Sequence, residues 1–362
     1  MNNEVWVLGA TGRTGRAVAT RLHEAGVPLV LVGRDCERLE ALAVELGGAP
    51  RLMVGSLVST LGELARDAPG VVVNTVGPFT TTAVDVARAC PPGTHYVDVA
   101  NELPAVEAIL GLDRQAAAAD QVFVTGAGFG VLATESVVLR LCAGLPRPSR
   151  VRVDALASVA TEAEVLGSAL AATIVEILAL GGRQVRRGRL VRSRVATDFT
   201  RLTTPDGDIL STASGANGEL IAAWRASNAD SVIAASTAAP SSAVVRFVLP
   251  AVVPIFRIPS VGRFAASRIA RIRLRAQGMP RPFSWGHAHA EWSSGTARDG
   301  WLRAGDGHTF TAAVATEVTQ RLLRGEGRPG AHTPGALFGP ELAQAVGGEF
   351  LIDEDRGTPP SR

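Results

Sequence analysis

Residues Val5–Asp35 read VWVLGATGRTGRAVATRLHEAGVPLVLVGRD, and this stretch decides the fold of the 362-residue chain. An apolar run suited to a buried strand comes first, then a glycine-rich turn, a helical pattern and a second apolar run. In such a unit the glycines permit a tight turn, a close approach of pyrophosphate to the backbone, and close packing of helix on strand. The N–H groups at the start of the helix favour phosphate. We therefore expect a dinucleotide to bind at Gly9, Thr11, Gly12, Arg13, Thr14 and Gly15.

The second strand of this unit ends in Gly33-Arg34-Asp35, and Arg38 follows one helical turn later. An acidic residue at this point binds the ribose 2′-hydroxyl of NAD, whereas an arginine accommodates the 2′-phosphate of NADP. Two guanidinium groups could bracket that phosphate, and Asp35 has the simpler role of capping the next helix. We therefore predict NADP(H) as the cofactor, with its adenosine end near Gly33, Arg34 and Arg38.

Composition excludes several kinds of chemistry. The chain has no lysine, so it has neither a Schiff-base lysine nor a P-loop lysine, and the lone tyrosine, Tyr96, cannot form a Tyr/Lys pair. A net charge of +2 gives the whole chain no nucleic-acid character. The three cysteines are far apart and form no C-x-x-C motif, and no signal-peptide pattern precedes the first strand. Both observations favour a cytoplasmic protein.

Apolar runs and helical patterns continue to alternate as far as residue 125, which is typical of an α/β fold with a doubly wound parallel sheet. Ligands bind at the carboxyl ends of the strands in such a sheet. The turn after Val71–Asn74 therefore becomes part of the cofactor site near the nicotinamide, and so does the glycine loop after Val122–Thr125. The residues expected to contribute are Val76, Gly77, Pro78, Phe79 and Gly128.

A change of pattern follows Pro146-Arg147-Pro148, which predicts a dinucleotide-binding domain over 1–147 and an α+β substrate or lid domain over 148–324. Within the second domain, Pro282–Trp292 and Gly300–Phe310 resemble two antiparallel strands, and a helix is expected from Thr311. Residues 325–352 could pack back on the first domain. The tail, residues 353–362, is expected to be disordered.

Four motifs together resemble the saccharopine dehydrogenase-like family. They are GATGRTGR at Gly9–Arg16, NTVGPF at Asn74–Phe79, HYVDVANE at His95–Glu102 and GAGFGVLATE at Gly126–Glu135. The resemblance implies a Rossmann NADP-binding domain, a separate substrate domain and an NADP-dependent oxidoreductase. The family includes amine-forming dehydrogenases and trans-acting enoyl reductase-type members. The chain departs from the family at Asn101-Glu102, where the usual pair is Gly-Glu.

Three residues are candidates for catalysis, and each has a simpler explanation. Asp98 and Glu102 flank the end of the fifth strand, where a carboxylate could orient a ribose or transfer a proton; Glu102 could equally be a first-turn acid that favours the helix dipole. His287 shares one strand face with His289 and Glu291, so it could serve a substrate pocket as a general acid, bind a metal or lie on a solvated face. We expect no metal.

From Ser231 to Ala290 the chain has no acidic residue, yet eight arginines alternate there with apolar side chains between Arg246 and Arg281. This pattern fits either a lid with a solvated face or a docking surface for an apolar molecule with an anionic handle. We therefore expect an NADPH-dependent reductase of a polarised double bond in an apolar biosynthetic intermediate, which could be linked to a carrier protein or coenzyme A. The alternatives are a saccharopine-type imine reductase and a non-catalytic NADP-binding sensor or scaffold. Peripheral membrane contact and a homodimer stay open, and no nucleic-acid partner is expected.

Overall fold

The structure is a computed structural model, and its described residues form two compact units. They are residues 3–48, 50–160, 179–194, 198–237, 258–273 and 275–352, with positions 171, 175, 196 and 256. Unit 1 comprises Met1–Ala100, Pro104–Gly128 and His308–Phe338. Unit 2 comprises Asn101–Leu103, Phe129–Gly307 and Gly339–Arg362. Each unit is described by itself.

Unit 1 is built on a parallel seven-stranded sheet in the order β15-β6-β5-β4-β1-β2-β3. Its first six strands in chain order reproduce the arrangement 3-2-1-4-5-6 of a doubly wound dinucleotide-binding fold, so the predicted fold class is confirmed. The strands are β1 (Val5–Leu8), β2 (Leu29–Gly33), β3 (Arg51–Val54), β4 (Val71–Asn74), β5 (His95–Asp98), β6 (Val122–Val124) and β15 (Gly330–His332).

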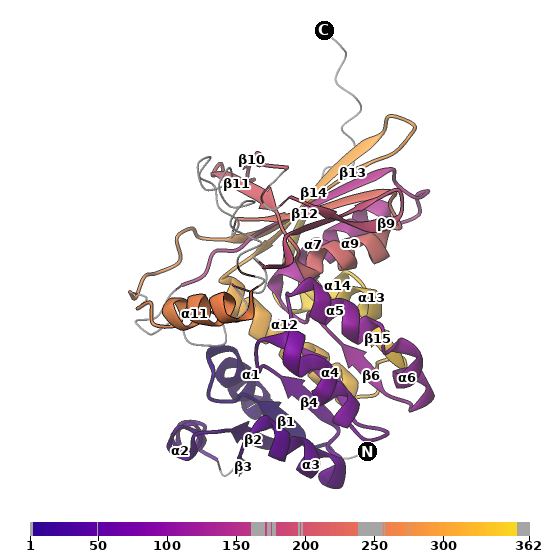
Figure 1. The fold of residues 1–362 in the computed structure, drawn as a ribbon. Coiled ribbons are helices and arrows are strands. Elements are labelled where there is room, and N and C mark those ends of the chain that lie inside the picture. Colours follow the sequence, from indigo (N-terminus) through magenta and orange to yellow (C-terminus); the bar gives the residue numbers. More distant parts are fainter. Residues whose placement is uncertain are drawn as a thin grey trace. The chain divides into compact units, whose positions relative to one another are not determined.

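Helices lie on both faces of this sheet (Figure 1). They are α1 (Arg13–Glu24), α2 (Cys36–Glu45), α3 (Leu57–Asp67), α4 (Phe79–Ala89), α5 (Leu103–Leu110), α6 (Asp113–Ala118), α12 (Gly307–Leu323) and α13 (Pro334–Phe338). Strands β1 and β4 are buried along their whole length, which explains why they read as uninterrupted apolar runs. Trp6, Tyr96 and Phe123 are among the largest fully buried side chains of this core.

Unit 2 is built on a mixed nine-stranded sheet whose main path is β10-β11-β12-β7-β13-β14-β16, with β8 and β9 added beside β12. Strands β12 and β7 are parallel, and β7, β13, β14 and β16 then pair antiparallel. The strands are β7 (Arg150–Leu156), β8 (Gly182–Arg186), β9 (Arg189–Ser193), β10 (Thr200–Thr203), β11 (Ile209–Ser214), β12 (Ser231–Ser236), β13 (Ser284–Glu291), β14 (Ala297–Ala304) and β16 (Glu349–Ile352).

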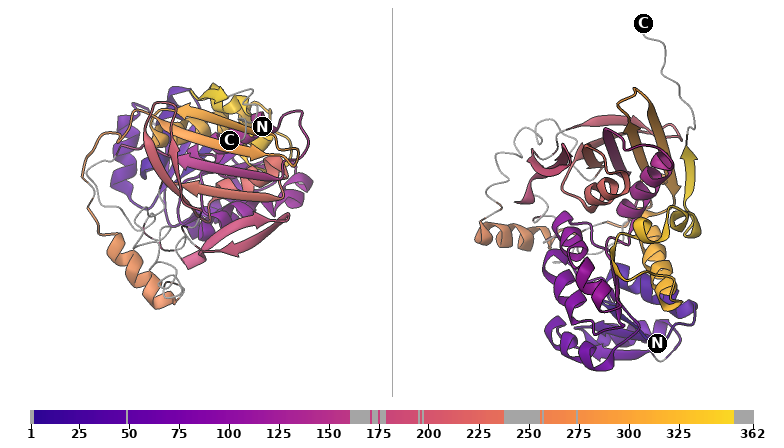
Figure 2. Two further views of the ribbon diagram at one scale, coloured as in Figure 1. Left: turned by 90° about the horizontal axis from the view of Figure 1, so that it is seen from above. Right: turned by 90° about the vertical axis from the view of Figure 1, so that its right-hand side faces the viewer.

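One face of this second sheet packs on two helices, α7 (Phe129–Cys142) and α9 (Gly218–Ser227). Glycines let α7 approach closely, because a Cβ on Gly286 would lie 2.7 Å from Ala133 Cβ and one on Gly300 would lie 2.9 Å from Val137 Cγ1. The side chains that alternate with Gly286 therefore point to the opposite face. The left panel of Figure 2 looks onto that face, where the strands lie in front of the helices. Unit 2 also contains α11 (Pro259–Ile269) and α14 (Glu341–Ala345).

The observed division of the chain differs from the predicted one. Residues 308–324, predicted in the second domain, lie in unit 1, and Asn101–Leu103, predicted in the first domain, lie in unit 2. The sequence places the boundary at residue 147, whereas α7 packs on the second sheet and belongs to unit 2. Of the segment 325–352, β15 joins the sheet of unit 1 and β16 pairs with β14 in unit 2. The tail 353–362 and two arginines of the basic region, Arg246 and Arg257, lie outside the described residues. Among the described residues, no helix combines the length and the apolar character needed to span a membrane.

Candidate functional site

The turn between β1 and α1 has the geometry of a phosphate-binding loop. Gly9 has a φ of +78°, a conformation that L side chains rarely adopt, and its carbonyl accepts the Gly12 N–H at 2.9 Å. A Cβ on Gly15 would lie 2.2 Å from the Gly9 oxygen, so only glycine lets α1 pack this closely. Gly12 occupies the N-cap of α1 and has no side chain to cap the helix. The first N–H groups of α1 therefore suit an anionic ligand.

The end of β2 presents the residues expected to recognise the adenosine phosphate. Asp35 caps α2 by accepting the Arg38 N–H at 3.1 Å, which confirms the capping role predicted from the sequence. The Arg38 guanidinium donates to the Thr11 carbonyl of the phosphate loop at 2.8 Å. Arg34 lies next to Asp35 and is exposed. Arg38 therefore lies at the loop that would hold the pyrophosphate. The carboxylate of Asp35 is occupied by its hydrogen bond to the start of α2.

The turn after β4 lies against the same loop. Thr75 Oγ1 donates to the Leu8 carbonyl at 2.7 Å, and a Cβ on Gly9 would lie 2.9 Å from this hydroxyl oxygen. Buried Asn74 accepts the Val76 N–H through its side chain at 3.0 Å. The Gly77-Pro78 peptide bond is cis, and Phe79 begins α4. The hydrogen bonds of Thr75 and Asn74 therefore hold this turn at the carboxyl edge of the sheet, next to the phosphate loop.

Asp98 ties two strand ends together and has no exposed surface. Its Oδ1 accepts the Ala100 N–H, the Gly126 N–H and the Thr125 hydroxyl, each at 2.9 Å. Burial raises the pKa of Asp98 to about 6, although these hydrogen bonds oppose the shift. The geometry therefore gives Asp98 a positioning role, holding the loops that follow β5 and β6. Gly128 lies in the second of these loops.

The first turn of α12 supplies site residues that the sequence did not reveal. His308 Nε2 lies 3.4 Å from Thr14 Oγ1 of the phosphate loop, across 294 residues of sequence. Thr311 lies beside the glycine loop, since a Cβ on Gly128 would be 3.2 Å from Thr311 Cγ2. The sequence predicted a strand through Phe310 and a helix from Thr311; this was wrong, because β14 ends at Ala304 and α12 begins at Gly307.

In unit 2, Glu102 lies in a segment that pairs with the residues before α9. It forms an isolated antiparallel bridge with Asn217, and its Oε2 accepts the Asn101 N–H at 3.1 Å. Glu102 is buried. A second buried acid, Glu219, lies in the first turn of α9 beside the Asn101 side chain. Its sequence context, an acid in a first helical turn, is so common that it gives no signal of a site.

His287 belongs to a chain of charged groups on the face of the second sheet opposite α7 and α9, in which His287 and Asp154 are buried. Its two ring nitrogens lie 3.1 Å from Asp154 Oδ2 and 2.9 Å from Asp299 Oδ1, and Asp299 Oδ2 lies 2.7 Å from His289 Nδ1. Arg152 completes the group by pairing with Asp154 at 2.8 Å. His289 Nε2 also faces Glu291 at 3.1 Å, so the shared strand face predicted from the sequence is occupied by ion pairs.

These contacts move the pKa values in opposite directions. Burial pulls the pKa of His287 down, but its hydrogen bonds to Asp154 and Asp299 outweigh burial and leave it raised. The hydrogen bond to Asp299 is the main reason that the pKa of His289 is raised. Burial pushes the pKa of Asp154 up, but His287 and Arg152 bring it below its ordinary value. Both histidines therefore bind a proton more strongly than a free imidazole does.

The same residues border a cavity of about 690 Å³. Arg152, His287, His289 and Asp299 line it together with Trp301 and residues of β10 and β16. Every nitrogen of the two imidazole rings already faces a carboxylate. The charges on this side of the cavity are therefore paired with one another. In the part of the chain that the structure describes, no group of three or more His, Cys, Asp or Glu side chains is arranged to hold a metal ion.

No family model matches the chain. Among solved structures, apo saccharopine dehydrogenase (L-Glu forming) from Saccharomyces cerevisiae is similar over 97% of this chain and 100% of its own, with a TM-score of 0.60 and 12% identity. The chain has the fold of saccharopine dehydrogenase. This likeness confirms the architecture expected from the four sequence motifs.

Two further similarities cover less of the chain. A sulfoacetaldehyde reductase from Chromohalobacter salexigens is 54% identical over 48 residues, which are 13% of this chain and 19% of that protein. The chain therefore matches about a fifth of the length of this curated relative. A short-chain dehydrogenase from Sphingobium yanoikuyae, solved with NADPH, matches 34% of this chain and 70% of its own at 21% identity and a TM-score of 0.30, which is too low to carry an argument.

Proposed function

We propose that this protein is an NADPH-dependent reductase that transfers hydride to a polarised double bond, a conjugated C=C, C=O or C=N group, of an apolar biosynthetic intermediate. The observation that carries the proposal is the phosphate loop of unit 1 with Arg38 bonded to Thr11 and Arg34 beside it. Since Asp35 already caps α2, the edge of β2 favours a 2′-phosphate over a ribose diol. The fold of saccharopine dehydrogenase and the local identity to a reductase support an oxidoreductase.

In this proposal the residues of unit 1 bind and orient the cofactor. The N–H groups at the start of α1 hold the pyrophosphate, and Arg34 and Arg38 recognise the adenosine phosphate. The turn Val76–Phe79 and Gly128 lie at the sheet edge where the nicotinamide end is expected. His308, whose Nε2 lies 3.4 Å from Thr14 Oγ1, adds a polar side chain beside the phosphate loop. The bound cofactor supplies the hydride, and the protein supplies position and electrostatics.

Calorimetry with NADPH and NADH tests the cofactor. Arg34→Ala is expected to weaken the binding of NADPH by roughly tenfold to a hundredfold, because a hydrogen bond to a charged group contributes about 1.5–3 kcal/mol. The affinity for NADH is expected to change much less. Arg66→Ala on α3 is the matched control, since Arg66 pairs with Glu63 on a helix surface. Equal loss of both dinucleotides in Arg34→Ala would contradict phosphate recognition, and no uptake of either by folded protein would remove the proposed function.

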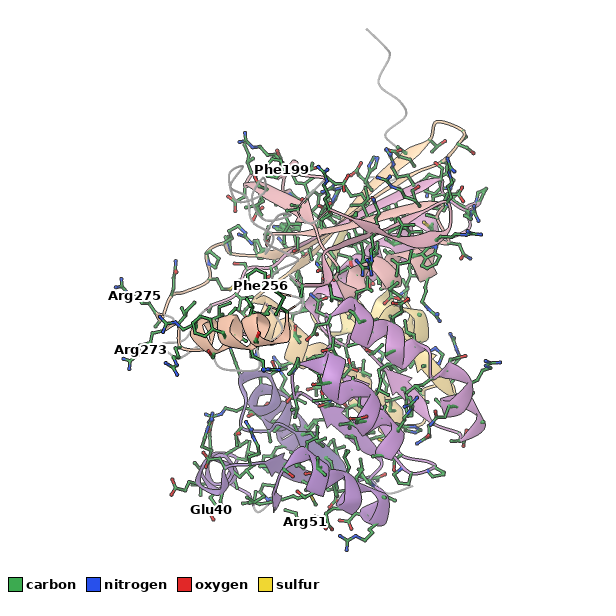
Figure 3. All side chains as sticks on the ribbon, in the orientation of Figure 1. Glu40, Arg51, Phe199, Phe256, Arg273 and Arg275 are labelled. Carbon is green, nitrogen blue, oxygen red and sulfur yellow. The ribbon has the colours of Figure 1, made fainter. Side chains whose placement is uncertain are left out.

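The choice of an apolar substrate rests on the described part of the basic region. Phe264 on α11 is 67% exposed, and Ile258 and Ile272 at the two ends of the helix are about half exposed. Arg273 and Arg275 extend from the chain beyond α11 (Figure 3). An apolar surface with arginines beside it suits an acyl group carried by coenzyme A, by an acidic carrier protein or at a membrane surface.

Oxidation of NADPH with panels of enones, aldehydes and imines tests the reaction class. Turnover of conjugated carbonyl compounds is the expected result; turnover restricted to imines would favour a saccharopine-type reductase. Tight NADPH binding with no turnover on any panel would favour the sensor or scaffold. We place the reaction in the cytoplasm, in keeping with three cysteines that are all free thiols.

A further inference from the structure

Glu219 is a buried acid that the cofactor site does not use. It lies in the first turn of α9 and is 2% exposed. Its carboxylate packs against the first turn of α7, because a Cβ on Gly130 would lie 2.1 Å from Glu219 Oε1. Glycine at position 130 therefore makes the room that this carboxylate occupies. A glycine that makes room for a buried carboxyl group suggests that this group has a function beyond packing.

The side-chain partner of Glu219 is the amide of Asn101. With its NH2 group turned inward, Asn101 donates to Glu219 Oε2 at 2.7 Å and to Oε1 at 3.3 Å. The backbone of Asn101 is held in place, since its carbonyl accepts the Gly218 N–H at 2.8 Å. Asn101 is exposed, whereas Glu219 is not. The amide thus joins a buried acid to the surface.

An amide can satisfy an acid in either protonation state. The NH2 group donates to a carboxylate, whereas the carbonyl oxygen accepts from a protonated carboxyl group. Rotation of the Asn101 amide by half a turn exchanges the two arrangements. Each arrangement presents the opposite end of the amide to the outside, so the protonation of Glu219 decides whether Asn101 offers a donor or an acceptor there.

Glu219 is poised to exist in both states near neutral pH. Burial raises the pKa of Glu219 to about 7, opposed by a backbone N–H and by the Asn101 amide. The elements packed against α9 are α7, β7, β8 and β12. Helix α7 and strands β7 and β8 carry charged side chains, namely Glu135, Arg140, Arg150, Arg152, Asp154, Arg183 and Arg186. Strand β12 carries none, and Glu102 follows Asn101 in the sequence. None of these described groups contributes a charge to the shift.

We propose that Asn101 hydrogen-bonds the substrate's carbonyl oxygen or imine nitrogen, and that Glu219 is the positioning residue that turns the donor end of Asn101 outward when it is protonated. The inference deepens the proposed function and rests on it for the identity of the substrate acceptor. Asn101 follows Ala100, whose N–H is bound by Asp98 at the carboxyl end of β5. Asn101 is therefore three residues beyond Asp98 along the chain, and Asp98 ends strand β5 at the edge where ligands of this fold bind.

Nuclear magnetic resonance on the free protein tests the coupling without any substrate. The side-chain NH2 signals of Asn101, assigned with Asn101→Ala, are expected to shift with pH around a midpoint near 7, and the shift is expected to vanish in Glu219→Gln. Glu107→Gln, an exposed acid on α5, is the control and should leave the titration unchanged. Asn101 signals that do not titrate, or that titrate equally in Glu219→Gln, would overturn the coupling whatever the protein reduces.

The pH profile of kcat/KM tests the role in the reaction. In the native chain kcat/KM should fall about tenfold per pH unit above the pKa of Glu219, because the donor end of Asn101 turns inward. Glu219→Gln should give a flat profile, since a neutral amide cannot titrate, and a slope retained in Glu219→Gln would overturn the proposal.

A second variant covers the case in which Glu219→Gln does not fold. Asn101→Ala changes an exposed side chain, so it should fold; it should lower kcat/KM and flatten its pH profile. It should also raise the pKa of Glu219 further, because the amide donor that favours the carboxylate is gone. An unchanged kcat/KM would contradict substrate contact. If the native protein does not bind NADPH, the proposed function is refuted, whereas the magnetic resonance test of the Glu219–Asn101 coupling stays valid.

Discussion

Gly15→Ala should damage both the stability and the cofactor affinity of unit 1. The added methyl group would lie 2.2 Å from the Gly9 oxygen and 2.8 Å from both the Gly9 carbonyl carbon and the Thr75 hydroxyl oxygen. Ordinary contacts begin at 3.4 Å, so α1 must move by about 1 Å against backbone that has no rotamer to change. Overpacking of this kind costs up to about 3 kcal/mol, and alanine recovers about 1 kcal/mol in helix propensity. We expect a net loss of about 2 kcal/mol.

The same displacement of α1 should weaken the binding of NADPH. The first N–H groups of α1 would be misplaced relative to the pyrophosphate, and each lost hydrogen bond to a charged group is worth about 1.5–3 kcal/mol. The dissociation constant should therefore rise by roughly tenfold to a hundredfold. Urea unfolding measures the first effect and calorimetry the second. Gly62→Ala on the exposed surface of α3 is the control, because nothing lies within 4 Å of its added methyl group; it should stabilise by about 0.5–1 kcal/mol. A Gly15→Ala protein with native stability and native affinity would refute the close-packing argument.

Three further predictions concern buried groups. Asp154→Ala should cost about 3–5 kcal/mol of unfolding free energy in urea, because Arg152 and His287 lose the buried carboxylate that they share; the exposed Asp85→Ala on α4 should cost almost nothing. The stability contributed by His287 should be complete below pH ~6.5 and lost as pH rises through its raised pKa, while that of Asp154 is lost as pH falls below ~4, so unfolding at a series of pH values should show a maximum between these limits. Tyr96, the lone tyrosine, is fully buried with a pKa raised well above its ordinary value, so an alkaline absorbance titration should show tyrosinate only as the protein unfolds; earlier ionisation would contradict its burial.

The sequence predicted unit 1 well because its signals are local. Val5–Leu8 and Val71–Asn74 are buried along their whole length, and the glycines Gly9 and Gly15 after the first strand are required by close packing. Parallel strands with helical crossovers then place every carboxyl-end loop at one edge. The resemblance carried by the motifs in these loops extended the prediction to the fold of the whole chain.

The ion-pair chain of unit 2 was hidden by an error of a few residues. His289 and Asp299 lie directly opposite each other on β13 and β14, a pairing that a correct hairpin register would have predicted. The sequence instead placed Asp299 in the connecting loop, because the alternation of Ala297–Ala304 is weak. Asp154 could not have been found in this way. It reaches His287 across 133 residues, and the order of strands in a mixed sheet does not follow from local pattern.

The sequence made both Asp98 and Glu102 candidates for orienting a ribose or transferring a proton, and the structure shows what holds Asp98. Oδ1 of Asp98 already accepts three donors from the loops after β5 and β6, so an excursion of Asp98 toward a ligand would leave Thr125, Gly126 and Ala100 without their acceptor. Leaving buried donors unpaired costs about 1–3 kcal/mol each, which disfavours a mobile proton-transfer role. Asn101, three residues further along the chain, is exposed and pairs with an acid whose pKa is near neutrality. The hydrogen bonds therefore suit Asp98 to a positioning role, and in our proposal Glu219 acts on the reaction through Asn101.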